Sequence, residues 1–186
     1  MQIDISAPRR TTSAAALPRT FAVCLLAGLP LAAVMLTPGL MRSRAELAPG
    51  LSALGIALFL GLSWLLVAGA PVLSARVAPF PGWRPATALR VSRALRRELA
   101  GPWWRRAGEA LLVFVGSQLA GGAVAAMIPY IWRNEADTAW VLHYPNYAIQ
   151  ALTMYVVIAF AAAWFGHRVR QLAQGVELVD NGQPLA

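Results

Sequence analysis

Long apolar stretches separated by short polar segments dominate the chain. Four of them lie at residues 21–40, 51–73, 110–132 and 147–166. Each is close to the ~20 residues that a helix needs to cross the hydrocarbon core of a membrane. None alternates polar and apolar residues as a half-buried strand would, and in lipid a helix satisfies its own backbone hydrogen bonds. The pattern predicts an all-α integral membrane protein, with residues 21–166 forming a single four-transmembrane-helix bundle.

The composition agrees with this prediction. The 186 residues are 58% hydrophobic and 13% charged, and the mean hydropathy is +0.55. A soluble domain carries about 25% charged residues. A disordered chain would be far more polar, and a disulfide scaffold would need more than one cysteine. The chain is also rich in alanine and its basic residues are all arginine, which suggests a GC-rich bacterial genome.

The first apolar stretch has a second interpretation, as a cleavable export signal. Arg9-Arg10 resembles the arginine pair of twin-arginine signals, and Ser43-Arg44-Ala45 resembles a small-x-small cleavage site. The arginine pair, however, lies about ten residues before the apolar stretch, and arginine stands where a cleavage site needs small or neutral residues. We therefore expect the first stretch to be an uncleaved helix.

The arginines set the expected orientation. Of the sixteen, three lie in residues 1–20, eight in the loop 74–107 and two in residues 167–186, against two in the first loop and one in the third. Basic loops and tails stay on the cytoplasmic side of a membrane. We therefore expect a bacterial inner-membrane protein with a disordered cytoplasmic N-terminal tail, a cytoplasmic loop 74–107 and a cytoplasmic C-terminal tail.

Residues 86–100 in that loop have the pattern of an amphipathic helix. Arginines occupy one face of it, and alanine, valine and leucine lie roughly opposite. A short cationic helix between two spans is expected to lie in the membrane interface, with its guanidinium groups on anionic headgroups. We do not expect nucleic-acid binding, because no stacking platform accompanies the charge. The residues expected to bind lipid headgroups or a protein partner are Arg90, Arg93, Arg96, Arg97, Arg105 and Arg106.

Small residues recur at a spacing of four on the third stretch. Ser117 and Gly121 form one such pair, and Gly122 and Ala126 form another. This spacing permits close approach of two helices, either within the bundle or between the chain and a partner. The sequence therefore predicts a helix-packing role for these four residues, with another membrane protein or a second copy of the chain as the possible partner.

Neutral polar residues and prolines interrupt the apolar stretches. Gln118, Gln150 and Thr153 could bond across helices or line a polar path through an oligomer. Pro30 in the first stretch and Pro71 near the end of the second predict kinks or helix ends, because proline lacks the backbone N–H that a helix uses.

Reactive groups are few. No ionisable residue lies in the middle of an apolar stretch, which argues against ion-coupled transport. His143 and His167 are expected on opposite sides of the membrane and so could not share a metal ion or a haem, and Cys24 has no partner thiol. Glu109 is the one carboxylate of interest, and a local ion pair with Arg105 explains it. We expect no metal site, no cofactor and no enzymatic activity.

Three functions remain as hypotheses. The leading one is a non-enzymatic membrane protein that acts by binding, as an accessory or assembly subunit or as a protector against a membrane-active toxin. The second is a small oligomeric transporter or channel without ion-coupling residues. The third is a membrane enzyme that acts on lipid through Glu109 and the nearby arginines.

Overall fold

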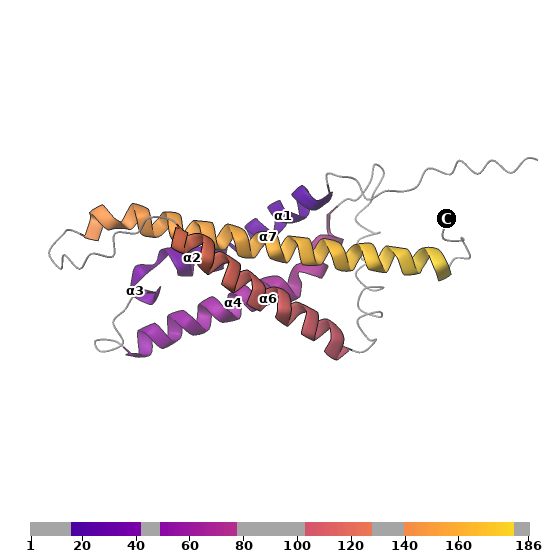
Figure 1. Ribbon diagram of the computed structural model, residues 1–186, viewed down its shortest axis with the longest axis horizontal. Helices are drawn as coiled ribbons and strands as arrows, with labels where there is room; N and C mark the ends of the chain where they lie inside the picture. Colours follow the sequence, from indigo (N-terminus) through magenta and orange to yellow (C-terminus); the bar gives the residue numbers. More distant parts are fainter. Residues whose placement is uncertain (1–15, 42–48, 78–102, 128–139, 181–186) are drawn as a thin grey trace, which may run out of the picture.

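The computed structural model describes residues 16–41, 49–77, 103–127 and 140–180, and these ranges contain helices and turns but no strand (Figure 1). The amphipathic helix predicted for residues 86–100 lies outside the described residues. The helices are α1 (Ala16–Ala27), α2 (Leu29–Leu36), α3 (Pro38–Met41), α4 (Pro49–Ala75), α6 (Trp103–Met127) and α7 (Trp140–Asp180).

Three of these helices are long and apolar enough to cross a membrane. They contain the candidate spans Gly50–Ala75, Ala107–Met127 and Tyr144–Gln171, which correspond to the second, third and fourth predicted stretches. The first predicted stretch is not one straight helix. It is divided among α1, α2 and α3, and α1 and α2 are bent by 53° and reach the length of a span only together. The described part of the chain is therefore that of an all-helical membrane protein, with three candidate spans, or four if the bent pair counts as one.

The break between α1 and α2 lies at Gly28, two residues before Pro30. Pro30 cannot donate a backbone hydrogen bond, so an interruption of the helix is expected beside it. Gly28 also lies in a tight contact, because a Cβ atom there would be 2.9 Å from Cε2 of Tyr155 and 3.2 Å from Cδ2 of Leu66. Pro71, by contrast, lies inside α4, and that helix continues past it to Ala75.

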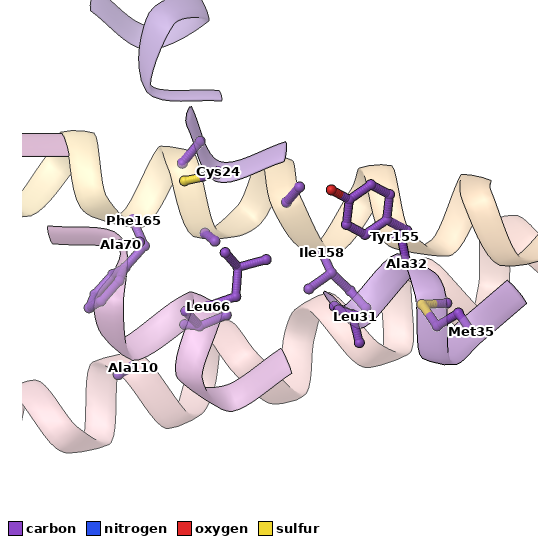
Figure 2. Close-up of a cluster of buried hydrophobic side chains, with 14 of the residues drawn as sticks. Cys24, Leu31, Ala32, Met35, Leu66, Ala70, Ala110, Tyr155, Ile158 and Phe165 are labelled. Carbon is purple, nitrogen blue, oxygen red and sulfur yellow. The ribbon is translucent and has the colours of Figure 1, made fainter. Parts of the chain in front are cut away.

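Helix α7 is the central element of the fold. It runs along the long axis of the molecule and packs against α1, α2, α4 and α6 (Figure 1). Its fully buried alanines, Ala159, Ala162 and Ala163, allow neighbouring helices to come close. Figure 2 shows the core side chains gathered between α7 and the helices around it, among them Leu31 and Ile158.

The end of α7 differs from the sequence prediction. The apolar stretch was expected to close at Gly166, before a cluster of basic residues, but the helix continues for another fourteen residues to Asp180. Arginine is a good helix former, so a change from apolar to basic residues marks a membrane boundary without ending the helix. The candidate span itself reaches Gln171.

Three tyrosines of α7 donate hydrogen bonds to backbone carbonyl groups of α1 and α2, the two helices of the broken first span. The hydroxyl of Tyr155 donates to the carbonyl of Leu25 beside the break. Near the end of α2, the hydroxyl of Tyr147 donates to the carbonyl of Met35, and that of Tyr144 donates to the carbonyl of Leu36 at 3.1 Å. Helix ends leave backbone carbonyls without helical partners, and in an apolar environment such groups need another donor.

Tyr155→Phe is expected to lower the free energy of unfolding by about 1–2 kcal/mol, because the ring stays while the donor to a backbone carbonyl is lost. The change can be measured by denaturant titration of the protein in bicelles. Tyr144→Phe is the control, since its hydrogen bond lies at an exposed position and water or headgroups can replace it. Equal losses in the two variants would contradict the assignment of Tyr155 to the break.

Candidate functional site

The two small-residue pairs of α6 lie on different faces of that helix. Ser117 is only 3% exposed, and its hydroxyl donates to the carbonyl of Phe114 at 2.7 Å within the same helix. Gly121 is buried against α7, where a Cβ atom would lie 2.9 Å from Cγ of Met154. This pair therefore brings α6 and α7 together inside the bundle.

The second pair points away from the bundle. Gly122 and Ala126 are both exposed, and a Cβ atom added at Gly122 would meet no atom within 4 Å. They share a helix face with Leu112 and Leu119, whose side chains are 74% and 70% exposed. We call the surface formed by Leu112, Val115, Leu119, Gly122 and Ala126 the outer face of α6.

The neutral polar residues have different surroundings, and one of them bonds α6 to α7. The side-chain amide of Gln150 in α7 donates to the carbonyl of Ala125 in α6 at 3.3 Å, and this hydrogen bond joins the two antiparallel helices. The hydroxyl of Thr153 donates to the carbonyl of Ile149 within α7 at 2.7 Å. Gln118 lies two turns before Ala125 on α6, and its amide nitrogen and oxygen are buried with no hydrogen-bond partner among the described residues. The structure thus places Gln150 at a helix contact, while Thr153 bonds within its own helix and Gln118 is left unsatisfied.

The predicted lipid-binding arginines are only partly described. Arg90, Arg93, Arg96 and Arg97 lie outside the described residues. Arg105 is exposed in the first turn of α6, and Arg106 follows it in the same helix. The binding role of this group stays a prediction.

Sequence reasoning missed a buried junction between α4 and α7. Arg170 is only 1% exposed, and its guanidinium Nη1 donates to the carbonyl of Ser74 in the last turn of α4. A cation at the carboxyl end of a helix is favourable because the carbonyl groups there carry partial negative charge. Arg170 therefore bonds two helices together, although its position after an apolar stretch suggested an exposed topology signal.

Ser74 and Gly166 complete this junction. The hydroxyl of Ser74 is buried and shares its one hydrogen between the carbonyl of Gly166, at 2.9 Å, and that of Pro71, at 2.8 Å. Opposite it, a Cβ atom at Gly166 would lie 2.7 Å from the carbonyl carbon of Ala70. Only a glycine allows the two backbones to come this close. We refer to Arg170, Ser74, Gly166 and Ala70 as the α4–α7 junction.

The remaining candidate groups are separate from one another. Cys24 is fully buried in the core, and His167 lies on α7 within 3.1 Å of the side-chain amide of Gln171. Within the described ranges, no three histidine, cysteine or acidic side chains come together as metal ligands. Comparison with protein-family models, curated proteins and solved structures finds no match to this chain.

Proposed function

We propose that this chain is a non-enzymatic, multi-pass protein of the bacterial inner membrane that works by binding another membrane protein, as an accessory or assembly subunit. In this proposal, both termini and the basic loop 74–107 are cytoplasmic, and the loop is held on anionic lipid. The partner helix packs on the outer face of α6.

The observation that carries this proposal is the difference between the two faces of α6. The inner face already uses its small residues, since Gly121 is buried against Met154. The outer face repeats the same spacing with Gly122 and Ala126, and both remain exposed. In lipid, association between helices depends on close packing, and small residues four apart permit it. The outer face therefore has the form of a second helix contact.

The contact of Gln150 supports helix packing over a polar path for this residue. Its side-chain amide donates to the carbonyl of Ala125 and so bonds α7 to α6. The hydroxyl of Thr153 bonds the carbonyl of Ile149 within α7.

Gly122→Leu tests the proposal, because it fills the outer face without touching the rest of the bundle. We expect the unmodified protein to be cross-linked in native membranes into an assembly larger than one chain, and Gly122→Leu to reduce this product several-fold, because a leucine prevents the close approach of a partner helix. Gly61→Leu is the matched control, since Gly61 is an exposed glycine of α4 with no atom near its Cβ position.

Two results would contradict the proposal. The first is an unmodified protein that is monomeric in its native membrane under the same cross-linking conditions. The second is an equal loss of the cross-linked product in the Gly61 and Gly122 variants, which would mean that the outer face of α6 has no special part in the contact.

A further inference from the structure

A groove of about 480 Å³ lies between α4 and the break in the first span. One wall is a single face of α4 that includes Leu62, Leu65 and Gly69. The other wall is made by the residues around the break, among them Pro30 and Leu31. The bend of 53° between α1 and α2 turns these two short helices away from a straight path, and the groove lies at this bend.

The groove is apolar along its length and has a cation at one end. Its α4 wall runs from Leu62 to Arg76, which corresponds to roughly 21 Å of helix at 1.5 Å per residue. Arg76 directly follows the candidate span Gly50–Ala75, so it lies where the hydrocarbon core meets the headgroups. Its side chain is exposed.

These dimensions suit one lipid chain better than a protein segment. Half of a bilayer's hydrocarbon core is about 15 Å thick, so an acyl chain that starts at Arg76 would end within the length of the groove. A helix is at least about 10 Å wide, so most of a helix laid along this wall would lie outside the groove. Leu65 is 65% exposed, so the groove opens toward the surroundings of the bundle.

We propose that this groove binds one anionic phospholipid. An acyl chain lies along the α4 wall past Gly69, and the negatively charged headgroup bonds the guanidinium of Arg76. The proposal does not depend on the outer face of α6, because no residue that lines the groove belongs to α6.

The test is native mass spectrometry of the full chain after reconstitution into vesicles of equal parts phosphatidylglycerol and phosphatidylcholine. We expect one retained phospholipid, with phosphatidylglycerol preferred. Arg76→Gln should lower its retention about fivefold, which is the contribution of one basic residue at an anionic surface. Gly69→Leu should abolish retention of either lipid, because a Cβ atom at Gly69 meets no protein atom within 4 Å and the new side chain would fill the groove.

Two controls separate this site from general lipid contact. Arg168→Gln removes an exposed arginine near the end of the candidate span of α7, and Gly61→Leu adds a leucine to α4 outside the groove; both should retain lipid as the unmodified protein does. Circular dichroism would verify that each variant keeps its helices. Equal retention of the two lipids, or retention in Gly69→Leu equal to that in Gly61→Leu, would overturn the proposal.

Discussion

Gly166→Ala is expected to lower the free energy of unfolding by about 3 kcal/mol, although it adds only one methyl group. That methyl group would lie 2.7 Å from the carbonyl carbon of Ala70, so α4 and α7 must move apart. Overpacking of this kind costs about 1–3 kcal/mol. Separation of the helices would also break the hydrogen bond from Ser74 to the Gly166 carbonyl, a further ~1 kcal/mol. Denaturant titration in bicelles would measure the loss.

Gly61→Ala is the matched control for this prediction. Gly61 lies in α4, and a Cβ atom there would meet nothing within 4 Å. Alanine is a better helix former than glycine by about 0.8–1 kcal/mol, so this variant should be slightly more stable than the unmodified protein. If Gly166→Ala and Gly61→Ala both raised the free energy of unfolding, the close approach of α4 and α7 at Gly166 would be disproved.

Arg170→Ala should be the second strongly destabilising change, with an expected loss of about 2–4 kcal/mol. A hydrogen bond from a charged group contributes about 1.5–3 kcal/mol. The substitution also removes the buried stem of the side chain, which leaves unfilled space between α4 and α7. The same unfolding titration would detect both effects, and the variant should still insert into the membrane.

Arg168→Ala controls for the change in charge. Arg168 is two residues away on the same helix, is exposed, and lies 5.5 Å from the ring centre of Trp164. Its loss removes the same positive charge from the same end of α7 but only an exposed cation–π contact, which is worth about 0.5–1 kcal/mol. Similar stabilities for the two variants would show that Arg170 acts only through its charge.

The positions of the long helices could be predicted because length and apolarity are properties of local sequence. Residues 51–73 and 147–166 fall within α4 and α7. Pro30 likewise marked the interruption of the first stretch, since the missing N–H group belongs to that residue alone. What could not be predicted locally is the close contact at the bend between Gly28 and Tyr155, more than a hundred residues away.

The two pairs of small residues on α6 show the same limit. Spacing alone does not show which of the two pairs, Ser117–Gly121 or Gly122–Ala126, is buried in the bundle. In the structure, only the first faces α7. Which face is buried depends on how α6 is rotated, and the sequence of one helix does not contain that information.

Arg170 was misjudged for a different reason. The count of arginines that sets the expected orientation assumes that each arginine is exposed. This assumption is correct for Arg168. A usable signal was nevertheless present, because Arg170 lies at helical spacing from Gly166, Ala163 and Ala159, all of them small and buried. An arginine that continues a stripe of small residues is placed to reach the end of a neighbouring helix.

The tyrosine hydrogen bonds give the protein an order of assembly. They join Leu25, Met35 and Leu36 to residues 108 to 130 positions later in the chain. Helix α7 follows the other described helices in the chain, so the carbonyls of α1 and α2 cannot accept these hydrogen bonds until α7 has been synthesised. The amino-terminal part of the bundle therefore reaches its final form only when the carboxy-terminal helix has been inserted. In a chain that stops before α7, the carbonyls of Leu25, Met35 and Leu36 would lack these donors. A membrane protease could recognise the incompletely packed amino-terminal helices.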